Sequence, residues 1–210
     1  MSSSQARIRV LAVDDHPLIR GGIAAMIRTT PDMTLVAEAV DGLEAVECFR
    51  AHRPDVTLMD LQMPRMNGNE AINAIRGEYP DARIVVLTTY KGDAQAMAAL
   101  KAGAWGFLLK DMLMSELVET VRAVHAGRRR IPPSIAMDIA EHAMEDSLSA
   151  REIEVLRLVA AGSPNKKVAT RLSISEDTVK AHMKSIMEKL SAVDRTHAVT
   201  IALKRGIIEL

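Results

Sequence analysis

Short apolar runs alternate with amphipathic stretches along the first 127 residues. The runs are rich in β-branched residues, which predicts strands, and the stretches have the apolar spacing of helices. Strands that are apolar on both faces and separated by helices indicate a parallel sheet covered on both sides, in a doubly wound α/β domain. We expect strands at residues 8–13, 34–39, 56–59, 83–88 and 106–109, and helices at about residues 17–30, 42–52, 67–78, 92–103 and 112–126.

From Ser149 onward the apolar residues have helical spacing only. Ser149 and Glu152 are spaced as a capping box, which predicts a helix start. Ser175 is a good N-cap for another helix. A short helix, a tight segment and a longer helix predict a helix-turn-helix. These helices are expected at residues 166–172 and 176–190, and a further one at about residues 194–205.

The alternation stops in the segment GRRRIPPSIAMDIAEHAMEDS, residues 127–147. Gly127 ends a helix, and the following Arg and Pro residues indicate a turn. A short helix is expected over residues 134–144. We therefore predict an α/β domain at residues 1–127, a linker with a short helix at residues 128–147, and a small all-α domain at residues 148–210.

Charge is distributed unevenly between the two predicted domains. The chain has 27 Lys+Arg and 27 Asp+Glu. Residues 148–210 contain 11 Lys+Arg and 7 Asp+Glu, which leaves 16 and 20 for residues 1–147. A basic C-terminal module is typical of nucleic-acid binding, and five aromatic residues in all argue against a single-strand binder that stacks bases.

Cellular location is suggested by composition. Neither a signal peptide nor an apolar run of membrane-spanning length is apparent. The single Cys48 excludes an intramolecular disulfide and fits a reducing compartment. We expect a soluble, cytoplasmic protein without membrane contact.

Polar residues stand where the predicted strands end. Asp14 and Asp15 follow the first strand, and Asp60 follows the third. With strand order 2-1-3-4-5, the first strand neighbours the third, and these carboxylates share one pocket at the carboxyl edge of the sheet. Three carboxylates repel one another unless a cation binds, and oxygen ligands suit Mg²⁺. Thr88 and Lys110 end the fourth and fifth strands on the far side of this pocket.

Such a pocket can carry a phosphorylated aspartate. Asp carboxylates act as nucleophiles to form aspartyl-phosphates, and phosphoryl transfer depends mainly on charge stabilisation. His16 is a poor ligand for Mg²⁺, and with Pro17 we interpret it as the start of a helix. Gly68 is expected to relieve a tight loop after Asp60.

The motifs VDDHP, TLMDLQMPRMNG, VVLTTY and GAWGFLLK resemble those of the receiver domain of two-component response regulators, with its flavodoxin-like five-stranded fold. The resemblance implies that a histidine kinase phosphorylates Asp60. It further implies that Mg²⁺ is held by Asp15, Asp60 and the backbone carbonyl of Gln62, with Asp14 acting directly or through water. The phosphoryl group would be bound by Lys110 and Thr88, and Phe107 occupies the position of the switch aromatic.

The predicted helix at residues 176–190 has one apolar face that we expect to be buried, so its opposite face is expected to be exposed. Lys180, Ala181 and Lys184 lie on this face, in the half of the helix where base contacts occur. The segment from Leu148 resembles the LuxR-type helix-turn-helix of the NarL/FixJ group, most specifically at TVKAH and SPNKKVA. The resemblance implies base or phosphate contacts by these three residues and dimerisation through residues 194–205. It also implies contacts of Lys166, Lys167, Thr178 and His182 with the DNA backbone.

Together these patterns predict a phosphorylation-activated, DNA-binding transcriptional regulator. Its partners would be a sensor histidine kinase, double-stranded DNA and a second copy of itself. Phosphorylated Asp60 is expected to repack the face around the fourth and fifth strands and to favour a DNA-competent dimer. We expect no enzymatic turnover beyond slow self-dephosphorylation.

Two alternatives are less consistent with the residues. An aspartyl-phosphate phosphohydrolase would also use Asp, Mg²⁺ and Lys. In such enzymes, however, the nucleophilic Asp belongs to a DxD motif that follows the first strand. Asp60-Leu61-Gln62 has no second carboxylate and follows the third strand. A regulator that senses an apolar small molecule would need an apolar cavity, whereas this pocket is acidic.

Overall fold

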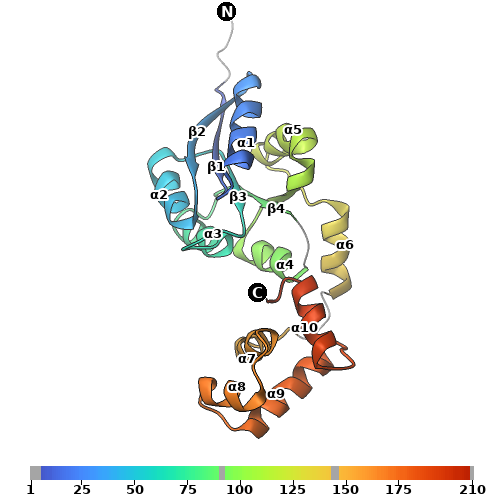
Figure 1. Cartoon of the computed structure of the whole chain (residues 1–210). Coiled ribbons are helices and arrows are strands. Elements are labelled where there is room, and N and C mark those ends of the chain that lie inside the picture. The colour runs from blue at the N-terminus through green and yellow to red at the C-terminus, as the bar shows by residue number, and fades with distance from the viewer. Residues whose placement is uncertain (1–5, 90–92, 143–146, 209–210) are drawn as a thin grey trace, which may run out of the picture. The chain divides into compact units, whose positions relative to one another are not determined.

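A computed structural model describes residues 6–89, 93–142 and 147–208 (Figure 1). The described residues form two compact units. The first lies within residues 1–90 and 97–133, and the second within residues 91–96 and 134–210. In the described part of the chain, the helices are too short or too polar to cross a membrane.

The first unit is built on a parallel sheet of five strands with the order β2-β1-β3-β4-β5. This confirms the strand order and the doubly wound fold predicted from the sequence. The strands are β1 (Ile8–Val13), β2 (Met33–Ala39), β3 (Val56–Asp60), β4 (Ile84–Thr88) and β5 (Gly106–Leu109). Asp60 is the last residue of β3 and pairs with Leu87, one position beyond the predicted strand end.

Helices cover both faces of this sheet, α1 and α5 on one side and α2, α3 and α4 on the other (Figure 1). Their bounds are α1 (Pro17–Thr29), α2 (Gly42–His52), α3 (Gly68–Glu78), α4 (Asp93–Ala102) and α5 (Leu113–His125), and a 3-10 turn, η1 (Lys110–Met112), precedes α5. These helix bounds agree with the predicted ones to within one residue. The predicted start of α4, residue 92, lies outside the described residues.

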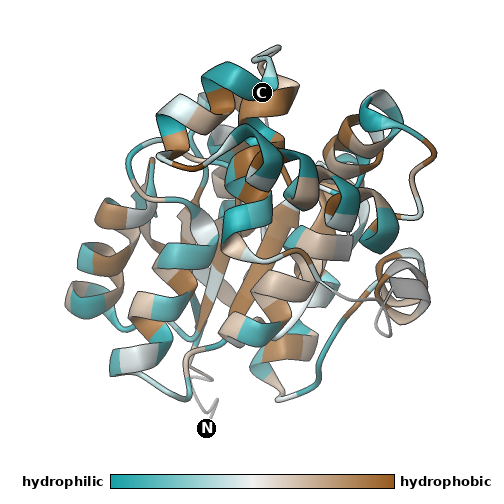
Figure 2. Cartoon of the chain, turned by 90° about the horizontal axis from the view of Figure 1, so that it is seen from below, coloured by the Kyte–Doolittle hydropathy of each residue, from teal (hydrophilic) through white to brown (hydrophobic). Residues whose placement is uncertain are grey.

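The interior explains why the strands read as apolar runs. Figure 2 shows largely hydrophobic strands among helices that carry both hydrophobic and hydrophilic residues. Val10 and Leu11 on successive positions of β1 are both fully buried, because each face of the sheet is covered. Burying an aliphatic side chain contributes about 1.5–3 kcal/mol, so the sheet is a rigid support for the residues at its edge. The core that α1 and α5 form with the sheet contains Val10, Ile23, Leu58, Val85, Leu108 and Leu117.

The first residues of the predicted linker lie along the free edge of β5. The Phe107 backbone N–H donates to the Arg130 carbonyl (2.8 Å), and the Arg130 N–H donates to the Trp105 carbonyl (3.3 Å). A Cβ on Gly106 would lie 2.8 Å from the Arg130 carbonyl oxygen, so this close approach depends on glycine. The short helix α6 (Pro133–His142) follows, and the last two predicted residues of that helix, 143 and 144, lie outside the described residues.

The second unit contains the predicted helix-turn-helix. Its helices are α7 (Ala150–Ala160), α8 (Asn165–Leu172), α9 (Glu176–Lys189) and α10 (Arg195–Lys204). Ser149 and Glu152 form the predicted capping box, and the Ser175 hydroxyl accepts from the Thr178 N–H as the N-cap of α9. The shared core includes Val155, Leu156, Val168, Val179, Met183, Ile186 and Ala198. The buried stripe of α9 leaves its other face exposed, as predicted.

Candidate functional site

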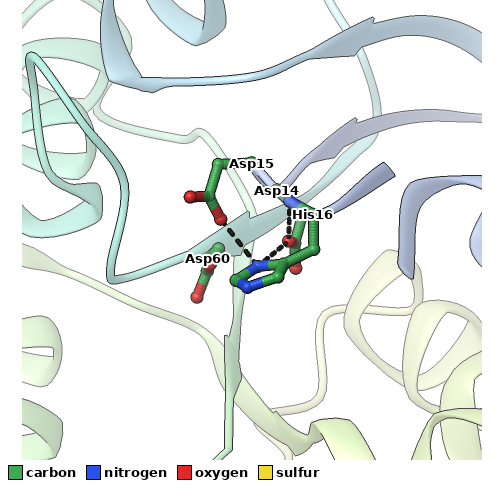
Figure 3. A group of neighbouring side chains, drawn as sticks. All are labelled: Asp14, Asp15, His16 and Asp60. Carbon is green, nitrogen blue, oxygen red and sulfur yellow. Dashed lines mark hydrogen bonds and ion pairs between the residues drawn. The ribbon is translucent and has the colours of Figure 1, made fainter. Parts of the chain in front are cut away.

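An acidic cluster lies at the carboxyl edge of the sheet, where β1 and β3 end side by side. One donor atom from each of Asp14, Asp15, His16 and Asp60 lies within 4.8 Å of the others (Figure 3). Asp14 and Asp15 directly follow β1, and Asp60 ends β3. The structure thus brings together the three carboxylates that the sequence placed at these strand ends.

Lys110 bridges two of these carboxylates. Its Nζ lies 2.7 Å from Asp14 Oδ2 and 2.9 Å from Asp60 Oδ2. Asp14 and Asp60 are only 0% and 3% exposed, and the Lys110 side chain is 8% exposed. Buried charges of this kind are tolerated only when paired, so Lys110 is an integral part of the site.

The pKa values report an electrostatically crowded pocket. Burial raises the pKa of Asp60, and the neighbouring Asp14 acts in the same direction, although Lys110 and the Gln62 N–H oppose the shift. Burial lowers the pKa of Lys110, but the carboxylates of Asp14 and Asp60 outweigh this and raise the pKa above its ordinary value. Burial thus disfavours the ionised form of Asp60 more than Lys110 and the Gln62 N–H favour it.

The residues present fit a divalent cation. Three ionised carboxylates and one ammonium group leave two negative charges uncompensated. One divalent cation would balance them. The buried oxygens Asp14 Oδ2, Asp60 Oδ2 and Asp15 Oδ1 have close ion pairs but, within the described chain, no hydrogen bond of good geometry. Hard oxygen donors of this kind suit Mg²⁺.

The loop after Asp60 is held in place by backbone and ionic contacts. The Gln62 N–H lies 3.4 Å from Asp60 Oδ1, so the main chain of this predicted ligand turns towards the pocket. Arg65, at a left-handed φ of 64°, forms ion pairs with the buried Asp41 and with Glu44 (3.0 Å) at the start of α2. The loop is thereby fixed to α2, a contact that no local sequence pattern signals.

Thr88 and Phe107 lie on the two neighbouring strands. Thr88 ends β4, is partly exposed and pairs with Leu109, the residue before Lys110. Phe107 in β5 is 1% exposed. Its neighbour Leu108 belongs to the core with α1 and α5, and side chains alternate along a strand, so Phe107 faces the opposite side of the sheet. Thr88 is thus near the pocket edge, whereas Phe107 is buried in the body of the domain.

The structure also assigns His16 to the site, which the sequence interpretation did not. His16 is the N-cap residue of α1, as expected of a residue that starts the helix, but its side chain makes no capping bond. Instead the imidazole Nδ1 lies 2.7 Å from Asp15 Oδ1 and 3.2 Å from Asp14 Oδ1 (Figure 3). The only sequence signal for this contact was that His16 follows the two aspartates directly.

Asp60→Asn is expected to stabilise the protein in the absence of divalent cations. A raised carboxyl pKa in the folded state means that ionised Asp60 costs folding free energy above the ordinary aspartate range, and this cost vanishes once acid protonates it. We expect the unfolding midpoint near neutral pH to rise by a few degrees. Saturating Mg²⁺ should shrink the gain, because it stabilises the wild type more. Thermal unfolding with EDTA or Mg²⁺ measures both effects.

The exposed Asp111→Asn removes the same charge one residue beyond Lys110 and is the matched control for this experiment. Its midpoint should stay close to that of the wild type. Equal or lower midpoints for Asp60→Asn would contradict the electrostatic crowding.

The exposed face of α9 carries the predicted DNA-contact residues. Lys180, Ala181 and Lys184 are exposed, and the two lysines lie about one helical turn apart. Lys180 Nζ lies 2.9 Å from Asp177 Oδ1, a hydrogen bond that raises the pKa of Lys180, and Lys184 Nζ lies 3.8 Å from Glu188 Oε1. These are surface pairs that a phosphate can replace at small cost. Each lysine is therefore available as a positive charge.

The remaining predicted DNA contacts are less uniform. Lys166 and Lys167 are exposed in the first turn of α8. Thr178 is exposed, but its hydroxyl lies 2.8 Å from that of Ser175 and so also belongs to the cap of α9. His182 is partly buried. The helix-turn-helix thus presents lysines from both of its helices.

Two protein-family models match the chain. One is described as the response regulator receiver domain and matches residues 10–122. The other is described as bacterial regulatory proteins of the luxR family and matches residues 146–202. The two matches cover most of both compact units.

Individual relatives match over nearly their whole length. The nitrate/nitrite response regulator protein NarL of Escherichia coli K12 is 37% identical, over 93% of this chain and 95% of the relative. RcsB of Salmonella enterica serovar Typhimurium, solved bound to promoter P1flhDC with the phosphomimetic BeF3−, is 27% identical, with a TM-score of 0.71 and coverage of 95% and 99%. A structure of two RcsB dimers bound to two parallel DNAs is 26% identical, with a TM-score of 0.68 and coverage of 94% and 98%.

Proposed function

Because the chain belongs to the response regulators that join a receiver domain to a LuxR-type helix-turn-helix, we propose that Asp60 is its phospho-acceptor. The protein is a DNA-binding transcriptional regulator controlled by phosphorylation. The observation that supports the assignment to Asp60 is its ion pair with Lys110 (2.9 Å) within one cluster with Asp14 and Asp15, at the edge where β1 and β3 meet.

The phosphoryl donor would be the phosphohistidine of a sensor kinase. A carboxylate oxygen of Asp60 attacks phosphorus, the P–N bond breaks, and its electron pair stays on the departing imidazole. The product is an acyl phosphate on Asp60. Lys110, already next to Asp60, supplies positive charge for the phosphoryl oxygens, and its buried position makes that charge more effective than in water.

The acidic edge of the pocket would hold Mg²⁺. Asp15, Asp60 and the Gln62 backbone carbonyl are the proposed ligands, with Asp14 acting directly or through water. When bound, the ion supplies charge that neutralises the carboxylates and the incoming phosphoryl oxygens. The ion pairs of Arg65 with Asp41 and Glu44 would fix the loop that contains Gln62 to the start of α2.

Phosphorylation would be transmitted through Thr88 and Phe107. It adds about −1.5 to −2 charges near Thr88, whose hydroxyl can donate a hydrogen bond to the phosphoryl group. If Thr88 moves towards Asp60, space opens on the sheet side where Phe107 packs. The Phe107 backbone is bonded to Arg130, so a shift of β5 would reach the linker directly.

The output would be a dimer on DNA. Lys180, Ala181 and Lys184 would enter the major groove, and α10 would form the contact between two copies. DNA contacts outside the groove would come from Lys166, Lys167, Thr178 and His182. In this proposal the receiver domain spans residues 1–127, the linker residues 128–147 and the DNA-binding domain residues 148–210. Because its target is DNA, the protein would act in the cytoplasm. Self-dephosphorylation would be slow, as suits a signal that must persist.

DNA affinity with a phosphoryl donor tests this function. A duplex selected by the wild-type protein from randomised DNA serves as the probe, with acetyl phosphate and Mg²⁺ as the donor system. We expect the wild type to bind about tenfold more tightly after treatment, since coupling free energies of 1–3 kcal/mol are usual. Asp60→Asn should give no gain, and the exposed Asp111→Asn should respond as the wild type does.

Equal responses of wild type and Asp60→Asn would overturn the proposal. Intact mass after treatment gives a second readout, because only proteins with Asp60 should gain one phosphoryl group. Steady release of phosphate from phosphomonoesters would point instead to the phosphohydrolase alternative.

A further inference from the structure

We propose that His16 is a ligand in the acidic pocket and that it makes this pocket favour transition-metal ions such as Co²⁺ and Zn²⁺ over Mg²⁺. The inference rests on the proposed function, because it concerns the cation site beside Asp60. It adds a nitrogen donor to that site and names the class of cation that the donor selects.

The first argument is the position of the imidazole. His16 Nδ1 lies 2.7 Å from Asp15 Oδ1 and 3.2 Å from Asp14 Oδ1, and all the donor atoms of the cluster lie within 4.8 Å of one another. Neighbouring donors in an octahedral site with metal–ligand distances of about 2.1 Å are about 3 Å apart. The separations of Nδ1 from these two oxygens are thus those of neighbouring ligands around one ion. They involve Asp14 Oδ1, whereas Lys110 contacts Asp14 Oδ2.

The second argument is the unsatisfied carboxylate next to the ring. Asp15 Oδ1 is a buried atom that accepts no hydrogen bond from the described residues, although the ring nitrogen is 2.7 Å away. The nitrogen therefore approaches Asp15 Oδ1 outside hydrogen-bond geometry. In Figure 3 the ring lies beside the carboxylates, with Nδ1 on the side of Asp14 and Asp15. A cation bound here would give Asp15 Oδ1 the partner it lacks, and it would replace the hydrogen bond that Nδ1 forms with Asp14 Oδ1 (3.2 Å).

The third argument is charge. Lys110 neutralises one of the three carboxylates, and no other described Lys or Arg side chain forms an ion pair with Asp14, Asp15 or Asp60. A divalent ion balances the remaining two charges whatever its identity. The choice among divalent ions then depends on donor type, and imidazole nitrogen favours Co²⁺, Ni²⁺ and Zn²⁺ over Mg²⁺.

Metal titration of the full chain tests this role. Wild type, His16→Ala and His16→Asn are titrated with Co²⁺ and with Mg²⁺ by calorimetry at neutral pH. We expect both variants to lose at least about tenfold in Co²⁺ affinity and to change little in Mg²⁺ affinity. The visible d–d bands of bound Co²⁺ should move to longer wavelength in both variants, because a nitrogen ligand is lost.

Suitable controls exist in the same chain. The His16 side chain is 66% exposed, so its replacement is compatible with folding, and asparagine remains a good N-cap for α1. His52→Ala removes another exposed imidazole, at the end of α2, and should leave the Co²⁺ affinity unchanged. Unchanged Co²⁺ affinity and spectra in both His16 variants would overturn the inference and leave His16 as a hydrogen-bonding neighbour only.

A measurement of phosphorylation in the same variants distinguishes failure of this inference from failure of the proposed function. All the variants are also treated with acetyl phosphate and Mg²⁺, and the phosphoryl group on Asp60 is detected by intact mass. If the wild type is phosphorylated but His16 does not affect Co²⁺ binding, only the present inference fails. If no protein is phosphorylated on Asp60, the proposed function fails, and the Co²⁺ titrations still decide the role of His16.

Discussion

Replacing Gly68 with alanine is expected to destabilise the receiver domain by about 3 kcal/mol and to weaken Mg²⁺ binding. A Cβ at this position would lie 2.1 Å from the Asp60 carbonyl oxygen and 2.8 Å from Leu61 Cα. Both are backbone atoms, so no side-chain rotation relieves the clash. The backbone of Asp60 or the start of α3 must instead move. This movement would also strain the hydrogen bond from the Gly68 N–H to the Leu61 carbonyl (3.0 Å).

Gly77→Ala is the matched control, because Gly77 lies in the same helix with nothing within 4 Å of the new Cβ. This substitution should stabilise the protein by about 0.5–1 kcal/mol, since alanine is the better helix former. Urea unfolding followed by the fluorescence of the single Trp105 reports on this domain. Opposite signs for the two substitutions are expected, and a Gly68→Ala protein as stable as Gly77→Ala would contradict the close approach.

Glu152→Gln is expected to destabilise the DNA-binding domain by about 2 kcal/mol at neutral pH, with part of the interaction screened by nearby water. Burial opposes ionisation of Glu152, but hydrogen bonds from Lys189 (2.8 Å), the Ser149 N–H (2.7 Å) and Ser185 (2.7 Å) outweigh it and hold its pKa at about 2. Glutamine retains the shape of the side chain but loses the charge that pairs with Lys189.

The pH dependence gives this prediction a second readout. A depressed carboxyl pKa contributes stability above the ordinary glutamate value of 4.5, and this contribution is lost as pH falls through about 2. The wild type and Glu152→Gln should therefore differ at neutral pH and converge in acid. Unfolding of this domain is followed by amide hydrogen exchange of α7 and α9, while Trp105 fluorescence should show an unchanged receiver domain.

Glu154→Gln provides the control in the same helix. Glu154 pairs with Arg151 at 2.7 Å on the surface, where both side chains are substantially exposed, so its loss should change stability by less than about 0.5 kcal/mol. Similar effects of the two substitutions would mean that the buried network around Glu152 does not hold α7 to α9.

Several features of the site could be predicted because they follow from local pattern and topology. The apolar run before Asp60 ends where a strand leaves the covered part of a parallel sheet. The run before Asp14 ends in the same way. Strand order then brings these ends together, since ligands bind at the carboxyl edge where the order reverses. The structure placed Asp14, Asp15 and Asp60 within one cluster, as this reasoning predicted.

Other features could not be predicted, because they depend on side-chain direction or on distant pairing. His16 has an ordinary position at a helix start, and only its side-chain conformation turns Nδ1 towards the carboxylates. Arg65 stands in a loop without periodicity and is paired to Asp41 in a different element. Arg130 reads as part of a basic turn, yet its backbone bonds to the edge of β5.

The sequence by itself determined the order of the elements, the two-part organisation of the chain and the strand ends that carry Asp14, Asp15, Asp60 and Lys110. These follow from contacts among residues a few positions apart, which periodicity and caps record. Only the tertiary structure decided that Lys110 bridges Asp14 and Asp60, that His16 joins them, and that Glu152 pairs with Lys189, 37 residues away. The pairs of Lys110 and Glu152 join residues that are far apart in the sequence and meet only when the elements between them pack together. Local sequence patterns carry no information about which distant residues will meet.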